Sequence, residues 1–132
     1  MKLNILASFF LIIILSGCVV TETPAQLSVP FQLRLGESAY FSSEDLTIEF
    51  FELNQDSRCP IGVQCIWEGE GIIKLQLSKD NQSLGELTLS TRDPVQTVGE
   101  YTIELVSLEP YPVEVGKLIP AEEYVATLNV SK

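Results

Sequence analysis

The chain has 132 residues, of which eighteen are acidic, eight are basic and none is histidine, so its net charge is −10 at pH 7. This acidity argues against nucleic acid as a partner, because a phosphate backbone repels a negatively charged protein. The lack of histidine removes the commonest general base and the usual activator of serine and cysteine nucleophiles. We therefore expect no binding to nucleic acid and no histidine-dependent catalysis.

The first seventeen residues are typical of a sorting signal. Lys2 precedes an apolar run of thirteen residues, from Leu3 to Leu15, in which only Asn4 and Ser8 are polar. Because a helix needs about 20 apolar residues to cross a membrane, a lasting transmembrane anchor is the weaker interpretation.

The run ends in Leu15-Ser16-Gly17-Cys18, which resembles the lipobox of bacterial lipoproteins. The resemblance implies that residues 1–17 are removed, that the Cys18 thiol carries a diacylglycerol and that the new amino group is acylated. Two or more acyl chains hold a protein stably on a membrane. We therefore expect a lipid-anchored protein outside the cytoplasm, on the outer membrane if the cell has two membranes. An ordinary signal peptide followed by an incidental cysteine is the alternative.

Cleavage before Cys18 leaves 115 residues with a net charge of −11, which is enough chain for one domain. Residues 18–29 show no clear periodicity, and we interpret them as a lipidated tether. Residues 30–132 then form a single domain.

From Pro30 onward, apolar residues recur at every second position, which predicts β-strands with one buried face. One-face burial is typical of antiparallel sheets. We predict an all-β fold, a small antiparallel β-sandwich or compact barrel of about seven strands. The predicted buried positions are Phe31, Leu33, Leu35, Leu46, Ile48, Phe50, Ile73, Leu75, Leu77, Leu87, Leu89, Tyr101, Ile103, Leu105, Tyr124, Ala126, Leu128 and Val130.

Three local features refine this prediction. The polar segment 79–83 predicts a hairpin turn between two strands. Phe50-Phe51 and Leu105-Val106 interrupt the alternation, which indicates bulges or points where a strand changes partners. At most a turn of helix is expected near residues 121–123.

Cys59 and Cys65 remain once Cys18 is assigned to the lipid. Outside the cytoplasm such a pair favours a disulfide, which would stabilise the fold by about 2 kcal/mol through loop closure. A zinc site is less favoured, because zinc normally takes about four ligands and the chain has no histidine. A redox centre is also less favoured, because its two cysteines usually lie closer together, at a helix start. We expect neither a metal nor a cofactor.

The segment Asp56–Glu70 also holds the only tryptophan. We favour packing of Trp67 over the disulfide, with an exposed aromatic anchor for a partner as the alternative. Arg58 is expected to pair with Asp56 or a nearby glutamate, as an exposed ion pair that contributes less than about 1 kcal/mol. The candidate partner-contact residues are Asp56, Arg58, Trp67, Glu68 and Glu70.

Asp56-Ser57-Arg58-Cys59-Pro60, Val63-Gln64-Cys65-Ile66-Trp67 and Gly69-Glu70 resemble the signature of an uncharacterised family of small secreted or lipid-anchored bacterial proteins. Two later segments, Glu109-Pro110-Tyr111-Pro112 and Tyr124-Val125-Ala126-Thr127-Leu128, are similar to that family's usual ending. The resemblance implies a compact extracytoplasmic β domain and no particular chemistry.

Three hypotheses about function follow. The first is a monomeric binding or accessory module of the cell envelope, which contacts a protein or glycan through the Asp56–Glu70 segment. The second is an acidic inhibitor of a basic envelope hydrolase such as lysozyme, steered to its target by charge. The third, which we rank last because we expect no enzyme, is a hydrolase that uses two of Asp56, Glu68 and Glu70. It requires a cleft that holds two carboxylates and raises the pKa of one.

Overall fold

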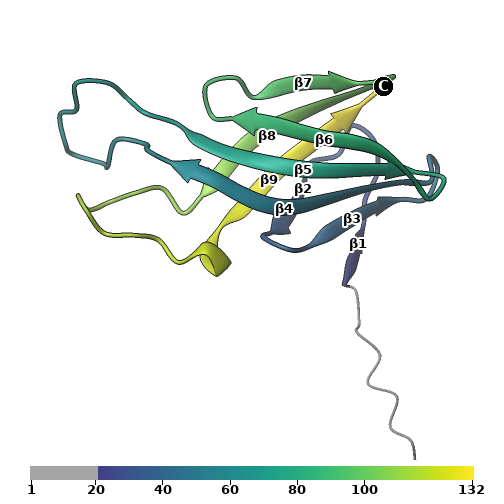
Figure 1. Cartoon of the computed structure of the whole chain (residues 1–132), viewed down its shortest axis with the longest axis horizontal. Helices are drawn as coiled ribbons and strands as arrows, with labels where there is room; N and C mark the ends of the chain where they lie inside the picture. Colours follow the sequence, from purple (N-terminus) through teal and green to yellow (C-terminus); the bar gives the residue numbers. More distant parts are fainter. Residues whose placement is uncertain (1–20) are drawn as a thin grey trace, which may run out of the picture.

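Two β-sheets packed face to face make up residues 21–132, the part of the chain that the computed structural model describes (Figure 1). The strand order is β1-β3-β4-β5-β6 in the five-stranded sheet and β2-β9-β8-β7 in the four-stranded sheet. Neighbouring strands are antiparallel, except that β1 and β3 are parallel. The elements are β1 (Glu22–Pro24), β2 (Phe31–Arg34), β3 (Ser38–Phe41), β4 (Leu46–Asp56), β5 (Gly71–Lys79), β6 (Gln82–Ser90), β7 (Val95–Val98), β8 (Tyr101–Glu109), the 3-10 turn η1 (Ala121–Glu123) and β9 (Val125–Ser131).

The core between the sheets consists largely of side chains that the alternation predicts to be buried, joined by Ala39, Phe41 and Leu108. All of those positions are buried except Leu35, which is partly buried and packs against the core. Phe31 of the four-stranded sheet meets Phe41 of the five-stranded sheet edge to face, with ring centroids 5.3 Å apart. Each buried leucine or isoleucine contributes roughly 1.5–3 kcal/mol, so this layer holds the two sheets together. The predicted sandwich is confirmed, and the sheets do not close into a barrel.

The described residues contain nine strands, where the sequence predicts about seven. The pattern does not reveal β3, which buries three of its four residues and therefore lacks a polar-apolar alternation. It does not reveal β1 and β7 either, which are edge strands of three and four residues. These short edges are held mainly by backbone pairing, and among their residues only Val98 packs against the core.

The sandwich extends further toward the N-terminus than the predicted boundary at residue 30. Beyond β1, the backbone N–H of Ala25 donates to the carbonyl of Tyr40 at 3.0 Å, and that of Ser28 donates to Val130 at 2.7 Å. Ala25 and Leu27 also pack against the core. Residues 22–29 of the predicted tether thus belong to the folded domain, held by backbone hydrogen bonds that leave no periodicity in the sequence. Residues 1–20, with the predicted signal and lipidated cysteine, lie outside the described residues.

The three local predictions are confirmed. The β5–β6 hairpin turns at Asp80 and Asn81, whose φ angles are positive at 51° and 60°. The register of β4 shifts after Phe50 and that of β8 shifts after Leu105, at the two interruptions of the alternation. The turn of helix is η1. Local sequence thus predicts where these strands bend and turn.

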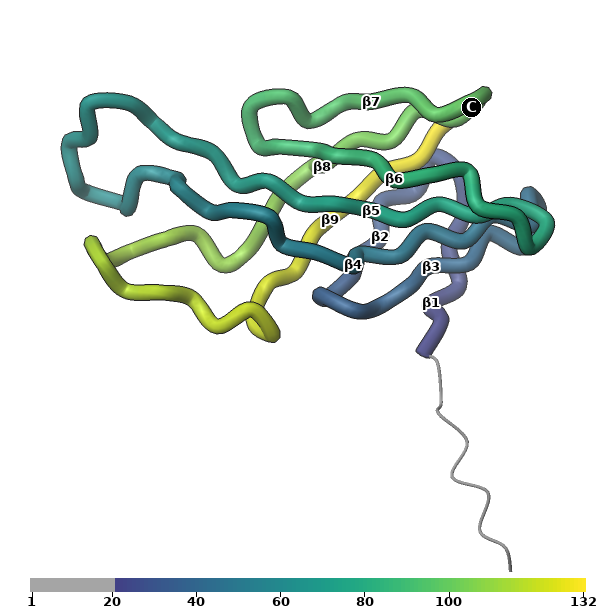
Figure 2. Tube along the Cα trace, viewed as in Figure 1, coloured from purple at the N-terminus to yellow at the C-terminus, as the bar shows by residue number. Residues whose placement is uncertain are grey.

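The two ends of the sandwich differ in their connections. At one end, which we call the loop end, residues 57–70 join β4 to β5 and residues 110–120 join β8 to η1 (Figure 2). We call these the disulfide loop and the proline loop. At the opposite end lie the short β3–β4 and β5–β6 turns and the C-terminus, and β1 lies in the half of the molecule away from the two loops (Figure 1). Within residues 21–132, no helix has the length and apolar character needed to span a membrane.

Candidate functional site

The disulfide loop is fixed at its base by one covalent bond and a short ladder of hydrogen bonds. Cys59 and Cys65 form the predicted disulfide. The N–H of Ser57 donates to the carbonyl of Glu70, and the N–H of Cys59 donates to that of Glu68, both at 2.8 Å. The ladder continues the β4–β5 pairing outward, so the loop projects from the sheet as a braced extension.

Two glycines make this base possible. Gly69 has a φ of 66°, and a Cβ at this position would collide with the carbonyl of Ser57. A Cβ at Gly71 would lie 2.7 Å from Cδ2 of Leu108, in the other sheet. A larger residue at Gly69 would disrupt the hydrogen-bonded base of the loop, and one at Gly71 would press against Leu108 of the other sheet.

Arg58 lies at the base of the disulfide loop and is 7% exposed, and its guanidinium joins two strand ends. Its Nε and Nη2 donate to the two carboxylate oxygens of Asp56, each at 2.8 Å. Its Nη1 donates to the carbonyl of Leu108 at 2.6 Å, and Nη2 also donates to that of Pro110 at 2.9 Å. The predicted pair of Arg58 with Asp56 therefore exists, but it is buried rather than exposed and ties the end of β4 to the end of β8.

The charges of this pair are held in place by hydrogen bonds. Burial would raise the pKa of Asp56, but hydrogen bonds from Arg58 and from the hydroxyl of Tyr124, at 2.7 Å, outweigh it, and the pKa lies below its usual value. Burial, followed by the hydrogen bond to Asp56, raises the pKa of Tyr124 to about 12. Asp56 is therefore ionised at neutral pH, which does not suit the raised-pKa acid that the hydrolase hypothesis requires.

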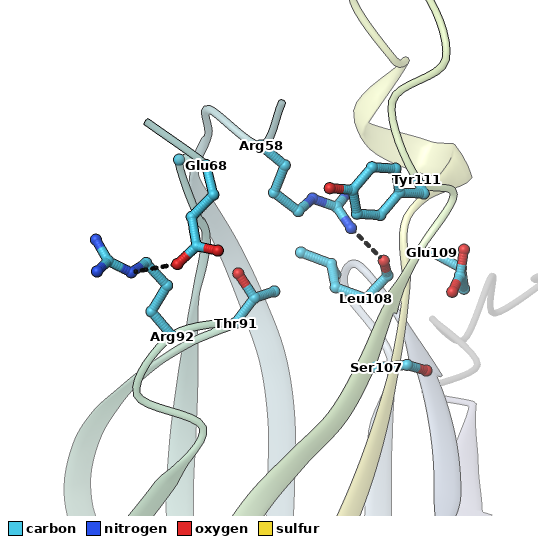
Figure 3. Close-up of a pocket in the computed structure, with 9 residues that line it drawn as sticks. Arg58, Glu68, Thr91, Arg92, Ser107, Leu108, Glu109 and Tyr111 are labelled. Carbon is cyan, nitrogen blue, oxygen red and sulfur yellow. Dashed lines mark hydrogen bonds and ion pairs between the residues drawn. The ribbon is translucent and has the colours of Figure 1, made fainter. Parts of the chain in front are cut away.

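A cleft with a volume of about 620 Å³ opens beside Arg58 (Figure 3). One wall comes from the disulfide loop and from the connection after β6, and the other comes from β8 and the start of the proline loop. Figure 3 shows Glu68 and Arg92 on one side of the cleft, and Glu109 and Tyr111 on the other. The lining residues are Arg58, Glu68, Gly69, Thr91, Arg92, Ser107, Leu108, Glu109 and Tyr111.

Each arginine of the cleft covers one aromatic ring. The guanidinium carbon of Arg58 lies 4.9 Å from the ring centroid of Tyr111, and that of Arg92 lies 5.3 Å from the ring of Trp67. Arg92 also pairs with Glu68, with 3.3 Å between Nε and Oε1. Trp67 is 55% exposed, so it belongs to the surface, as the alternative interpretation of the sequence has it. It lies outside the core because the disulfide loop projects beyond the two sheets.

The structure gives the five candidate contact residues different positions. Arg58 and Glu68 line the cleft, and Trp67 borders it through its contact with Arg92. Asp56 is buried against Arg58 and is a structural residue. Glu70 takes part in the base of the disulfide loop through its backbone.

A second feature of the loop end is a group of exposed apolar side chains, which we call the apolar tip. Eight of the twelve large apolar side chains exposed within residues 21–132 lie on the two loops. The loops are joined, because the N–H of Ile61 donates to the carbonyl of Pro112 at 3.0 Å. The apolar tip consists of Ile61, Val63, Ile66, Trp67, Tyr111, Val113, Val115 and Leu118.

Sequence reasoning missed the proline-loop half of the apolar tip. Tyr111, Val113 and Val115 alternate as in a strand, yet the segment forms none. Pro110 and Pro112 lack the N–H that a sheet ladder needs. Apolar alternation within a segment that cannot join a sheet is the signal that could have identified this exposed surface.

Comparison with known proteins adds no relative. No protein-family model, no curated protein and no solved structure matches the chain. The resemblance of the Asp56–Glu70 segment to a family of small bacterial proteins therefore stays a prediction.

Proposed function

We propose that this protein is a lipid-anchored binding domain of the bacterial cell envelope, and that its apolar tip contacts a protein partner through an apolar surface of that partner. The observation that carries the proposal is the concentration of exposed apolar side chains on two adjacent loops. Single exposed apolar residues are normal on protein surfaces, whereas a cluster marks an interaction site. Ile66, Val115 and Leu118 are the most exposed members, at 108%, 73% and 90%.

The rigid attachment of the two loops supports a role in binding. A loop that is rigid before association loses less conformational entropy when the partner arrives. The disulfide, the buried Arg58 pair and the Ile61–Pro112 hydrogen bond each restrict the loops. This bracing would be of little use in loops that only connect strands.

The direction of the apolar tip also agrees with anchoring at the N-terminus. The described chain begins at β1, in the half of the molecule away from the loops (Figure 1). A domain held through the residues before β1 would present its loop end away from the anchor. A partner in the surrounding envelope could then reach the apolar tip.

A second candidate, an acidic inhibitor of a basic hydrolase, is favoured by the charges around the apolar tip. Within residues 21–132, the carboxylates of Glu70, Glu122 and Glu123 take part in none of the ion pairs. The cations Arg92 and Lys117, by contrast, are paired inside the domain. The dependence of binding on salt concentration distinguishes the two candidate functions. Binding steered by these carboxylates weakens as ions screen them, whereas an apolar contact persists.

Site-specific crosslinking in cells tests the proposal. The full-length protein carries a photo-crosslinking amino acid at Leu118, and a matched protein carries it at Gln82, an exposed residue at the opposite end. We expect a discrete adduct with one envelope protein from Leu118 and none from Gln82. Adding Val115→Glu should remove the adduct. Equal adducts from both positions, or an adduct that Val115→Glu leaves unchanged, would contradict the proposal.

Lipid anchoring is tested separately by Cys18→Ser. We expect this variant to leave the membrane fraction, because the sulfur that would carry the diacylglycerol is absent. The measurement is the distribution of the protein between membrane and soluble fractions of the same cells. Sedimentation with membranes that equals that of the unchanged protein would refute the anchor without bearing on the apolar tip.

A further inference from the structure

The cleft beside Arg58 contains a hydrogen-bond donor that the fold does not use. A guanidinium carries five N–H groups. In Arg58 four of them are used, one each on Nε and Nη1 and two on Nη2. The second N–H of Nη1 has no acceptor among the described residues, although the side chain is only 5% exposed. Because Arg58 lines the cleft, a ligand in the cleft can supply the missing acceptor.

Other polar groups of the cleft are also available to a ligand. Glu109 is exposed, and within residues 21–132 its carboxylate has no ion-pair partner. Thr91 accepts a hydrogen bond from the N–H of Gly71 at 3.1 Å, which leaves its hydroxyl proton free to donate. Ser107 adds a second hydroxyl. The cleft thus offers both donors and acceptors within a small space.

Two aromatic rings flank these groups. Tyr111 lines the cleft and Trp67 borders it, and each ring is covered on one face by an arginine. The two residues are still 41% and 55% exposed. Aromatic rings held in this way can pack against the apolar C–H face of a sugar ring, while the polar groups between them bond to its substituents.

The net charge of the cleft favours a neutral ligand over an anionic one. Arg58 is balanced by Asp56 and Arg92 is balanced by Glu68, so Glu109 leaves one negative charge in excess. An anionic ligand would be repelled, and a neutral one would not.

We propose that this cleft binds a neutral oligosaccharide that carries acetamido groups. An acetamido group matches two unpaired polar groups of the cleft. Its carbonyl can accept from Nη1 of Arg58, and its N–H can donate to Glu109. The binding mode is separate from the apolar tip, because the polar groups that carry it lie outside that surface. Only Trp67 and Tyr111 belong to both.

The single tryptophan permits a direct test, since all tryptophan emission of the chain comes from Trp67. The full-length protein is kept in a detergent without a sugar headgroup and titrated with the tetrasaccharide of N-acetylglucosamine. We expect a saturable change in emission, with matching heat in calorimetry. Maltotetraose, a tetrasaccharide without acetamido groups, should bind at least roughly tenfold more weakly, as expected when hydrogen bonds to a charged group are lost.

Variants of β8 separate the cleft from general effects of charge. Glu109→Gln removes the acceptor charge of the cleft and should weaken binding roughly tenfold. Glu104→Gln makes the same change at an exposed position of the same strand outside the cleft, and it should leave binding unchanged. Within residues 21–132 the Glu109 carboxylate takes part in no ion pair, so the variant should fold.

Three outcomes would overturn the proposal. They are no saturable response at millimolar tetrasaccharide, equal binding of maltotetraose, and an affinity that Glu109→Gln does not change. Val115→Glu distinguishes this proposal from the protein-binding one. It should abolish the crosslinked adduct and leave the sugar titration unchanged, because Val115 lies outside the cleft.

Discussion

The two ends of the sandwich are stabilised in different ways. At the opposite end, the hydroxyl of Tyr101 donates to Glu44 at 2.8 Å and accepts from Lys79. Glu100 and Lys132 extend this group with further ion pairs, at 3.1 to 3.2 Å. These charged side chains lie largely at the surface, around short turns that need little support. Such pairs contribute little and are screened by salt.

The loop end, by contrast, holds long connections with interactions that solvent does not screen. Arg58 and Asp56 are buried, and the disulfide crosslinks the loop above them. A buried ion pair is costly to desolvate and is held only by good geometry and further hydrogen bonds. The loop end is therefore fixed by buried and covalent interactions, which the opposite end lacks among the described residues. This agrees with a surface that must keep its shape for a ligand.

The largest difference between the ends should come from Arg58→Gln. The change leaves Asp56 buried without its charge partner and removes hydrogen bonds to Leu108 and Pro110. We expect the free energy of unfolding to fall by about 3–5 kcal/mol. Urea denaturation measures it.

The matched control for that variant is Arg92→Gln, which removes the exposed pair with Glu68 in the same cleft. We expect this control to cost at most about 1 kcal/mol. Equal losses in the two variants would show that the buried pair does not carry the stability of the loop end.

The next largest effect should come from the disulfide. Replacing Cys59 and Cys65 together by serine should lower the free energy of unfolding by about 2 kcal/mol, because the unfolded chain gains the freedom of the opened loop. Thermal or urea unfolding of the double variant measures the loss.

Alkylation of the unchanged protein under non-reducing conditions should label neither of these two cysteines. Labelling of both would contradict the disulfide.

The pH dependence of stability should also separate the ends. The lowered pKa of Asp56 stabilises the fold above the ordinary value of 3.8, and this stabilisation is lost as the pH falls below it. The raised pKa of Tyr124 stabilises the fold below its ordinary value of 10.0, and this contribution is lost as the pH rises toward about 12. The free energy of unfolding, measured across pH, should therefore be constant near neutral pH. It should decline in acid, where Asp56 is protonated, and in alkali, where Tyr124 loses its proton.

Salt sharpens this prediction, because the screening length in about 1 M salt is only about 3 Å. The surface carboxylates Glu44 and Glu100 also have lowered pKa values, through hydrogen bonds from Tyr101 and Lys132 respectively. In high salt their part of the acid decline should shrink, because screening weakens the attraction of Glu44 and Glu100 to Lys79 and Lys132. The part due to buried Asp56 should remain. Asp56→Asn should remove that remaining part. An unchanged acid decline in this variant would contradict the assignment.

A smaller effect is expected from Glu100→Gln at the opposite end. The change removes ion pairs with Lys79 and Lys132, both at the protein surface. The loss of stability should be well below that of Arg58→Gln and should disappear in high salt. Calorimetry at low and high ionic strength measures it. A large loss that salt does not alter would mean that the opposite end is not the weakly held one.

The smallest effect on stability is expected from Ile66→Ser in the apolar tip. Ile66 is fully exposed, and surface changes of this kind usually alter stability by at most about 0.5 kcal/mol. The variant should unfold like the unchanged protein in urea while losing the crosslinked partner. A marked loss of stability would assign Ile66 a structural role instead.

Much of the fold follows from the sequence because the sandwich has one buried face per strand. Alternation places the core residues of β4, β5, β8 and β9 correctly, and two of the bulges lie where the alternation fails. The shifts after Leu53 and Leu77 leave no such signal. β3 escapes this reasoning because Ala39 and Ser38 are both buried, on successive positions. A periodicity of two cannot reveal a strand that buries both of its faces.

The candidate site is less predictable, because it depends on contacts between distant segments. The pair of Arg58 with Asp56 is local and can be predicted, whereas its burial comes from Leu108 and Pro110, 50 and 52 residues away. Nothing in the sequence of the disulfide loop indicates that β8 ends beside Arg58. The contact of Arg92 with Trp67 cannot be predicted from the sequence for the same reason. It depends on how the β6–β7 connection meets the disulfide loop.

The way the chain enters the sandwich has a mechanical consequence. β1 pairs with β3 in one sheet, and four residues later Ser28 is bonded to Val130 in the other. Tension applied to the N-terminal side of β1, as by an anchor in a moving membrane, is therefore shared between both layers. A pull along the strand axis loads the three β1–β3 residue pairs in shear, together rather than one after another. The force is borne close to where the chain enters, and the distant loops keep their shape under load.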